Sequence, residues 1–332
     1  MAVAVLGAGG FIGSRVTEAL IERGEEVLVV SHSVPTHERR LRAWESASHR
    51  ALADLRDEAV DLQGCDQVFN FAADMGGVGY FSQAQVGPYI TNSRITFNVL
   101  EMAGMQKVSA LFMASSACAY PIDLQQTPGR APELTEDLLE RGPADQMYGR
   151  EKLMLCVLGQ QVDFDCRVGI LHTIYGDAES SSWTKMKFPT AIARKALEAR
   201  ENGVIRVWGD GSQLRSYLWI DDAVNKILCV MRGENPGPIN IGRQGAISVR
   251  EIVEICCQHL GIAPEIVFDP SAPSGVLSRD CSNNKFWSIY GEMEPTDYRT
   301  GFGWLIDDIA VSEATLQKTS EALHPRKDLS EA

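Results

Sequence analysis

Three glycines near the N-terminus constrain the fold of this chain more than any other feature. An apolar run over residues 1–6 predicts a buried strand, Gly7, Gly10 and Gly13 follow it, and a helical pattern covers residues 14–23. In such a unit the first glycine makes a tight turn, the second lets the backbone approach a pyrophosphate, and the third lets the helix pack on the strand. The helix N-terminus offers free N–H groups and a positive dipole end to phosphates. Glycines also mark ordinary turns, but this context favours a nucleotide-binding loop.

Strands and helices alternate through the first half of the chain. The segments 26–30, 66–72, 109–115 and 167–171 are short apolar runs, and a helical pattern covers 90–103. Such strands, alternating with helices, are typical of a parallel sheet that is covered on both faces. Ligands of these sheets bind at the carboxyl ends of the strands. We therefore expect an α/β fold, a Rossmann-type doubly wound parallel sheet with a smaller C-terminal α/β substrate lobe.

The pattern changes after Lys152. We expect residues 1–170, joined by some later segments, to form a nucleotide-binding domain, residues 171–325 to form mainly a substrate-binding lobe, and residues 326–332 to be a polar tail. In the second lobe the sequence predicts, in order, a loop over 172–176, a helix over 188–202, a strand-turn-strand unit over 207–217, a helix from 220, a strand over 239–242 and an amphipathic helix over 249–260.

Two segments carry reactive side chains. Ser116 and Cys118 follow a predicted strand, and Tyr148 and Lys152 lie four residues apart in a helical pattern. Residues four apart share a helix face, so the Lys152 ammonium is expected to lower the pKa of the Tyr148 phenol and make it a general base. Ser116 would supply a partner hydroxyl. Cys118 would add a second acid or base; the competing interpretation is a small buried hydrophobic residue.

Composition and charge restrict the classes of function. The net charge of −13 argues against general binding to nucleic acid or to anionic membranes. No apolar run reaches the roughly 20 residues that span a bilayer, and no basic segment precedes the first apolar run, so a signal peptide is not expected. The cysteines include no C-x-x-C pair, and no metal site is expected. A cytoplasmic protein with reduced cysteines is the simplest interpretation.

The chain resembles the extended short-chain dehydrogenases/reductases that act on nucleotide sugars. The resemblance rests on the glycine loop, Asp54-Leu55, the Tyr-x-x-x-Lys pair and the segment WGDG over 208–211. Within that family the chain is most similar to the GDP-mannose 3,5-epimerases. The similarity is carried by AADMGG over 72–77, ASSACAYP over 114–121, Lys187-x-Pro189 and Gln213-x-Arg215-Ser216. GDP-fucose synthases share the cysteine segment but not AADMGG, and Lys187 stands in place of their general-acid histidine.

The resemblance implies a mechanism. Tyr148 would remove the proton of the sugar C4 hydroxyl while hydride passes to NAD, and the resulting ketone would acidify the hydrogens at C3 and C5. Cys118 and Lys187 would then be the acid–base pair that inverts C3, C5 or both, before the hydride returns to C4. NAD would be recycled and not consumed. The competing interpretation of Lys187 is a solvated surface lysine.

The resemblance also implies which residues bind the cofactor. The expected cofactor-binding residues are Gly7, Gly10, Phe11, Ile12, Gly13, Ser31, Asp54, Leu55, Ala72, Ala73, Tyr148 and Lys152. Ser31 and His32 follow the second strand, where an acidic residue that binds the ribose 2′-hydroxyl is usual. The resemblance favours NAD, while His32, Arg39 and Arg40 leave NADP open.

A GDP-hexose is the expected substrate. The resemblance implies contacts from Gly76, Ser116, Ala117, Cys118, Thr173, Met186, Lys187, Pro189, Lys195, Gln213, Arg215, Ser216 and Arg279. Arg215 and Arg279 suit a diphosphate, because arginine can bind an anion through two N–H groups. Thr173 replaces an asparagine that is usual in the family, which indicates an altered substrate. His172 is expected to be structural. The family also implies a homodimer.

Three functions remain open. A GDP-sugar 3,5-epimerase that recycles NAD is the leading one. A GDP-4-keto-6-deoxysugar 3,5-epimerase/4-reductase would consume NADPH instead, and other nucleotide-sugar 4-epimerases or dehydratases follow. A dehydratase normally has Asp-Glu where this chain has Ala117-Cys118. A non-catalytic nucleotide sensor is disfavoured because Ser116, Tyr148 and Lys152 are all present.

Overall fold

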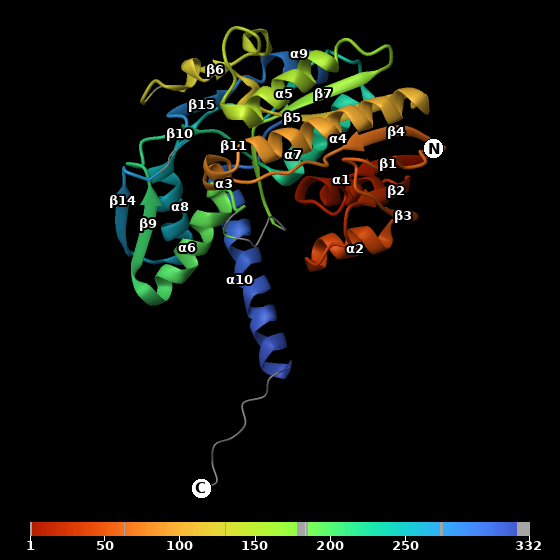
Figure 1. The fold of residues 1–332 in the computed structure, drawn as a ribbon. Helices are drawn as coiled ribbons and strands as arrows, with labels where there is room; N and C mark the ends of the chain where they lie inside the picture. Colours follow the sequence, from red (N-terminus) through yellow and green to blue (C-terminus); the bar gives the residue numbers. More distant parts are fainter. Residues whose placement is uncertain are drawn as a thin grey trace.

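A large parallel sheet with helices on both faces forms the centre of the molecule in the computed structural model (Figure 1). The structure describes residues 2–62, 64–129, 131–177, 183, 185–272 and 275–323, with side chains up to residue 312. The expected polar tail over 326–332 lies outside these residues.

The main sheet has seven strands in the order β12-β7-β5-β4-β1-β2-β3, and all neighbours are parallel. The five strands predicted over 1–6, 26–30, 66–72, 109–115 and 167–171 are present, with ends that differ by at most two residues. This confirms the Rossmann-type fold. The strands are β1 (Ala2–Leu6), β2 (Glu26–Ser31), β3 (His49–Leu52), β4 (Cys65–Asn70), β5 (Ala110–Ser116), β7 (Cys166–Leu171) and β12 (Ile239–Ile241).

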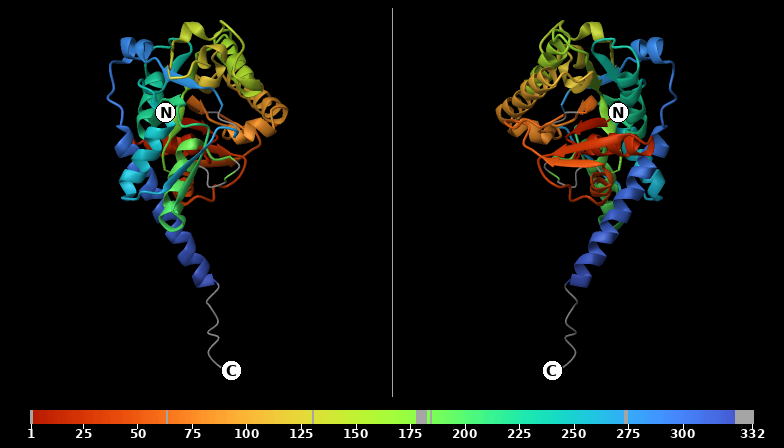
Figure 2. Two further views of the ribbon diagram at one scale, coloured as in Figure 1. Left: turned by 90° about the vertical axis from the view of Figure 1, so that its left-hand side faces the viewer. Right: turned by 90° about the vertical axis from the view of Figure 1, so that its right-hand side faces the viewer.

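Helices cover the two faces of this sheet with separate hydrophobic clusters. Figure 2 shows α4 (Val86–Met105) and α5 (Gln146–Leu158) on one side and α7 (Ile220–Arg232) on the other. Val99 and Leu155 pack with the first side, and Val224 packs with the second. The other helices are α1 (Phe11–Glu22), α2 (Glu38–Ser46), α3 (Val78–Gln83), α6 (Phe188–Asn202), α8 (Val249–Leu260), α9 (Asn284–Tyr290) and α10 (Tyr298–Leu323).

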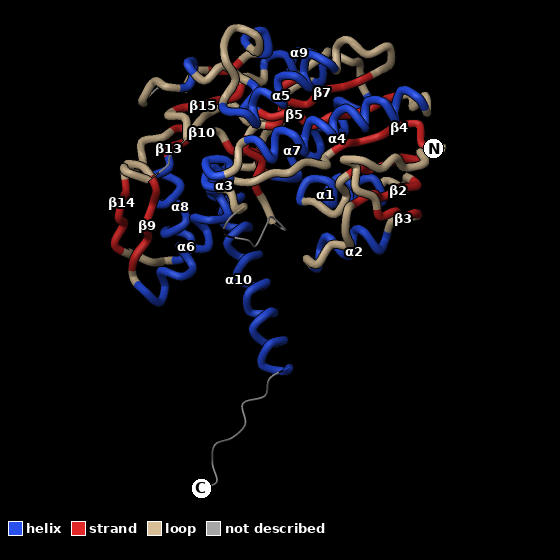
Figure 3. Tube along the Cα trace, in the orientation of Figure 1, coloured by secondary structure: helices blue, strands red, loops and turns tan. Residues whose placement is uncertain are grey.

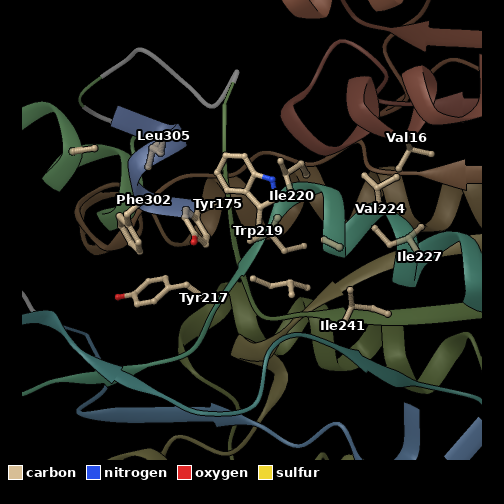
Figure 4. Packing of buried hydrophobic residues seen from close by; sticks show 14 of the residues in the cluster. Val16, Tyr175, Tyr217, Trp219, Ile220, Val224, Ile227, Ile241, Phe302 and Leu305 are labelled. Carbon is tan, nitrogen blue, oxygen red and sulfur yellow. The ribbon is translucent and has the colours of Figure 1, made fainter. Parts of the chain in front are cut away.

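Aromatic side chains join α10 to the centre of the molecule. Tyr175 stacks on Phe302 with ring centroids 4.7 Å apart, and the edge of its ring meets Trp219 at 5.4 Å. Figure 4 shows these rings continuing into the aliphatic cluster that includes Val224 and Ile241. One continuous core therefore holds the first half and the C-terminal helix together.

Smaller sheets build the second lobe, and one sequence prediction is wrong here. Residues 172–176 were expected to form a loop, but Thr173–Tyr175 is strand β8, which pairs in parallel with Tyr217–Trp219, strand β11. A partner more than forty residues away leaves no local signal. The remaining strands are β6 (Glu133–Leu134), β10 (Leu214–Arg215), β13 (Ile247–Ser248) and β15 (Ser278–Cys281), which share a sheet, and the pair β9 (Val204–Trp208) and β14 (Glu265–Asp269) (Figure 3).

The predicted domain boundary at residue 170 remains a prediction. Strand β12, from the second half of the chain, lies in the main sheet, and β6, from the first half, lies in a sheet of the second lobe.

Two helices of the second lobe have the bounds that the sequence predicts, because strong terminal signals fix them. Helix α6 has a proline in its first turn and ends before Gly203, whose φ is 71°. Helix α8 begins with a capping box between Ser248 and Glu251 and ends before Gly261, whose φ is 64°. Among the described residues, no helix is long and apolar enough to cross a membrane.

Candidate active site

The glycine loop has the close backbone contacts that its sequence predicts. Gly7 has a φ of 78°, and a Cβ there would lie 2.5 Å from the amide nitrogen of Ala72. A Cβ on Gly13 would lie 2.3 Å from the carbonyl oxygen of Gly7. Helix α1 begins after Gly10 with no side-chain cap and no acidic residue in its first turn. The loop therefore fits a dinucleotide pyrophosphate, since free N–H groups of a helix N-terminus bind phosphate.

A cavity of about 540 Å³ lies at the carboxyl ends of β1, β4 and β5 and is closed by the second lobe. It brings together most of the predicted site. The predicted residues that line it are Gly10, Phe11, Ile12, Gly13, Ala73, Gly76, Ser116, Ala117, Cys118, Tyr148, Lys152, Thr173, Met186, Lys187, Pro189, Lys195, Gln213, Arg215 and Arg279.

Six predicted residues do not line this cavity. Gly7 lies in the glycine loop against the backbone of Ala72, and Leu55 and Ser216 are buried. Ser31 packs against Gly9, whose Cβ would be 2.5 Å from the Ser31 hydroxyl oxygen. The sixth, Asp54, accepts hydrogen bonds from Arg56. Those bonds lower the pKa of the Asp54 carboxyl to about 2. Their contacts with a cofactor remain predictions.

Tyr148 is buried on α5 and is held by an aromatic neighbour. Its ring stacks on Phe81 of α3, with centroids 4.6 Å apart and ring planes 24° apart. Burial raises the pKa of Tyr148 well above its ordinary value, the charges of Cys118 and Glu151 raise it further, and a hydrogen bond with Ser116 lowers it only in part. The Lys152 ammonium lies 5.6 Å from the ring centroid and 3.1 Å from a Glu151 oxygen. The pKa of Tyr148 in the protein alone is therefore raised and not lowered as expected, because burial of the phenol has the largest effect.

Cys118 lies in a short 3-10 turn after β5, directly against the start of α5. Its N–H donates to the Ser116 hydroxyl at 3.2 Å, and its carbonyl oxygen accepts from the N–H of Asp145 at 3.0 Å. A Cβ on Gly149 would lie only 2.1 Å from that carbonyl oxygen. Only glycine at this position lets the cysteine turn approach the helix that carries Tyr148.

Arg279 joins the cysteine turn to the second lobe. Its Nη1 donates to the Cys118 sulfur at 3.5 Å, its Nη2 to Asp145 at 3.0 Å, and its Nε to Gln125. Burial works to lower the pKa of Arg279, but Cys118 and Asp145 raise it. The guanidinium thus places a positive charge directly beside the sulfur. Its predicted diphosphate contact remains a prediction.

The other predicted cations lie around the same cavity. Lys187 is the N-cap residue of α6, directly before Phe188 and Pro189. Lys195 Nζ donates to the carbonyl oxygen of Arg206 at 2.8 Å, and burial lowers the pKa of Lys195. Burial and, next, the charge of Arg279 lower the pKa of Arg215 to about 10. The cavity therefore carries several cations although the chain as a whole is acidic.

His172 lies in a buried hydrogen-bond network behind the cavity, as a structural histidine would. Asn240 Oδ1 accepts from the Tyr120 hydroxyl at 2.8 Å and contacts His172 Nε2 at 3.0 Å. The side-chain nitrogen Nδ2 of Asn240 donates to the carbonyl oxygens of Leu134 and Ser282. Burial lowers the pKa of His172 to about 3.

Several neighbours of the reactive groups were missed by sequence reasoning. Phe81 contacts Tyr148, Gln125 and Asp145 hold Arg279, and Glu151 pairs with Lys152. The only available signal was for Glu151, which lies beside Lys152 within the Tyr-x-x-x-Lys motif. Within the described residues, no group of three or more His, Cys, Asp and Glu side chains is placed to hold a metal ion.

The parallel sheet, the glycine loop and the cavity at the carboxyl ends of the strands are those of a Rossmann-type nucleotide-binding protein. Residues 3–242 match the NAD dependent epimerase/dehydratase family, and the chain belongs to that family. NAD is the cofactor of this family.

Relatives carry two related activities. The chain is 33% identical over 289 residues to GDP-mannose 3,5-epimerase 1 of Oryza sativa subsp. japonica, covering 85% of this chain and 74% of the relative. It is 27% identical over 289 residues to GDP-L-fucose synthase of Escherichia coli, covering 82% and 85%. The fold resembles UDP-glucose 4-epimerase of Thermus thermophilus, solved with NAD, with a TM-score of 0.78, 20% identity and coverage of 93% and 99%.

Proposed function

We propose that this protein is a GDP-hexose 3,5-epimerase of the GDP-mannose 3,5-epimerase type. The observation that carries the proposal is the meeting of two kinds of groups in one cavity. Ser116, Tyr148 and Lys152 are groups for oxidation and reduction, while Cys118 and Lys187 are a thiol and an amine able to exchange protons. An oxidoreductase without epimerisation has no need of the second pair.

The residues have distinct roles in the proposed reaction. Tyr148, hydrogen-bonded to Ser116, takes the proton of the C4 hydroxyl. Bound NAD would supply a reversible hydride acceptor for C4. The ketone at C4 acidifies the hydrogens at C3 and C5. Cys118, with Arg279 beside its sulfur, and Lys187 remove and deliver protons at these centres.

The cofactor contacts follow the same proposal. Gly10, Phe11, Ile12 and Gly13 at the start of α1 bind the pyrophosphate, and Ala73 lies next to them in the cavity. Gly7 and Ala72 meet backbone to backbone at the loop, and Ser31 packs against Gly9. With Asp54 and Leu55, which follow β3, they complete the proposed set of cofactor contacts. Arg39 does not favour a 2′-phosphate, because its guanidinium binds Glu18 and Asp177. This supports NAD over NADP.

The substrate is proposed to be a GDP-hexose that lies along the second lobe. Arg215 and Lys195 are partly buried cations that line the cavity, and they suit a diphosphate. Thr173 and Gln213 line the same cavity. Gly76, Ala117, Met186, Pro189, Ser216 and Arg279 complete the proposed set.

We propose that the protein acts as a homodimer through α4. Four exposed apolar side chains, Val86, Ile90, Phe97 and Met105, share one side of this helix and are 51–76% exposed. A second copy would cover them, and Phe97→Glu should then yield a monomer in sedimentation experiments. A wild-type protein that sediments as a monomer would contradict the proposed dimer. A cytoplasmic location is part of the same proposal, since all eight cysteines are free.

The experiment that tests the function is NMR of GDP-mannose with purified protein in D2O. We expect deuterium at C3, C5 or both, new hexose signals and no net change of NAD. Absence of exchange with GDP-mannose would contradict the proposal. Turnover of a GDP-4-keto-6-deoxysugar with stoichiometric use of NADPH would instead show the GDP-fucose synthase type of reaction.

A further inference from the structure

The segment that leads to Lys187 is fastened to the nucleotide-binding half by an ion pair. Lys185 Nζ lies 2.8 Å from Asp74 Oδ1 and 4.8 Å from the centroid of the Tyr80 ring. The Tyr80 hydroxyl donates to the other Asp74 oxygen at 2.7 Å. Both carboxylate oxygens of Asp74 are therefore used, one by each partner.

Asp74 is itself held firmly by α4. Its N–H donates to Asn92 Oδ1 at 2.7 Å, and Asn92 Nδ2 donates to its carbonyl oxygen at 3.1 Å. Asn92 is 1% exposed and lies in a helix of 20 residues. The carboxylate of Asp74 thus projects from a backbone that is anchored to a rigid element.

A second contact lies one residue before Lys187. A Cβ on Gly77 would lie 2.4 Å from the carbonyl oxygen of Met186. The backbone of Gly77 has a φ of −78° and a ψ of −179°, which any residue adopts. The requirement for glycine is therefore the space that Met186 occupies and not the conformation of the chain.

Lys187 is fixed on its other side by α6. It is the N-cap residue of this helix, and Pro189 in the first turn is buried. The backbone of Lys187 is thereby held between Met186 and the 15-residue helix α6. Misplacement of a reacting group by about 1 Å can lower a rate about a hundredfold.

We propose that Asp74 and Gly77 are positioning residues that hold Lys187 for proton transfer, with Lys185 as the counterion. This inference rests on the proposed acid–base role of Lys187. The Lys185 and Asp74 side chains are 44% and 22% exposed, and ion pairs of this kind contribute little to stability. The pair therefore acts on the geometry of the reaction more than on the fold.

The test separates the two chemical steps in GDP-mannose reactions in D2O. In Asp74→Asn and in Gly77→Ala we expect deuterium exchange at C3 and C5 to fall about 10- to 100-fold. Oxidation at C4, followed by the absorbance of reduced nicotinamide, should stay within about twofold, because Tyr148 keeps its hydrogen bond with Ser116 and its neighbour Lys152 on α5. Lys185→Met should behave like Asp74→Asn, and Lys185→Arg should retain exchange.

Matched control variants exclude general effects of the substitutions. Asp57→Asn removes the carboxylate of another exposed pair, with Arg94 at 3.6 Å. Gly87→Ala adds a Cβ on α4 where no atom lies within 4 Å. Both controls should exchange at the wild-type rate. Unchanged exchange in Asp74→Asn and Gly77→Ala, or an equal loss of C4 oxidation and exchange, would overturn the inference.

Limited proteolysis keeps the inference testable if GDP-mannose is not the substrate. A wild-type protein without exchange would refute the proposed function alone. Trypsin cleavage after Lys185 and Lys187 then reports directly on the fastening of this segment. Asp74→Asn should be cut several times faster than the wild type and than Asp57→Asn. Equal rates of cleavage would overturn the inference whatever the substrate is.

Discussion

Nη1 of Arg279 lies 3.5 Å from the sulfur of Cys118, although 161 residues separate the two in the sequence. The same guanidinium holds Asp145, whose backbone N–H binds the carbonyl oxygen of Cys118. A single arginine from the second lobe therefore contacts the thiol and also holds the residue that binds the backbone of the cysteine turn. This contact depends on the two lobes being folded together.

Replacing Arg279 by lysine should weaken the thiol as an acid–base group. Lysine cannot keep the contacts with Cys118, Asp145 and Gln125 together, because it lacks a planar fork of donors. A charge-assisted hydrogen bond contributes about 1.5–3 kcal/mol, so exchange at C3 and C5 should fall about 10- to 100-fold. Alkylation of Cys118 by iodoacetamide should also slow. Alkylation at the wild-type rate would contradict the pairing, and Arg141→Lys on the surface is the control.

Adding a methyl group at Gly149 should push the cysteine turn away from α5. The new Cβ would meet the Cys118 carbonyl oxygen at 2.1 Å, and overpacking of this kind costs about 1–3 kcal/mol. We expect Gly149→Ala to lower the midpoint of urea unfolding and to reduce exchange at C3 and C5. Gly87→Ala, which has open space, should show neither effect. Wild-type stability and exchange in Gly149→Ala would mean that the contact is not tight.

The pH dependence of C4 oxidation should follow Tyr148. Burial first, and then the charges of Cys118 and Glu151, raise the pKa of Tyr148, so the phenolate is scarce near neutral pH. The oxidation rate should rise from neutral into alkaline pH. Glu151→Gln removes one negative charge and frees Lys152, so the profile should move to lower pH. Glu140→Gln, an exposed change, should leave it in place; a profile that moves to higher pH in Glu151→Gln would contradict the assignment.

Stability should fall at acidic pH because of His172. Burial lowers the pKa of His172 from 6.5 to about 3, so the unfolded chain binds a proton that the folded protein excludes between these values. The free energy of unfolding should therefore decrease as the pH falls below about 6.5, by about 1 kcal/mol per pH unit from this group. His172→Gln should flatten the dependence measured by urea unfolding at pH 7 and pH 5. If the free energy of unfolding changed with pH as steeply in His172→Gln as in the surface control His49→Gln, this role would be refuted.

The sequence predicted those parts of the site that follow from local pattern. The glycine loop, the strand that ends at Ser116 and the pair of Tyr148 and Lys152 all lie where strand and helix signals place them. Their side chains meet in one cavity because parallel strands bring their carboxyl ends to one edge of a sheet. Helix α6 was predicted to the residue because its proline and glycine signals mark both ends.

Contacts between distant segments could not be predicted in the same way. The contact of Phe81 with Tyr148 depends on the orientation of the six-residue helix α3, which follows β4. The pKa of Tyr148 was misjudged because its largest cause is burial of the phenol, which depends on how distant segments pack around α5. The strand at Thr173 was missed because its partner, β11, lies far along the chain. These features arise from packing and not from local propensity.

The most direct test of the account compares the wild type with Cys118→Ala for GDP-mannose in D2O. The account predicts that Cys118→Ala still reduces bound NAD by oxidation at C4, while exchange at C3 and C5 falls about 10²- to 10⁴-fold. The two steps would then share one cavity but use different groups. Full deuterium exchange in Cys118→Ala would contradict the central claim that the thiol inverts the sugar.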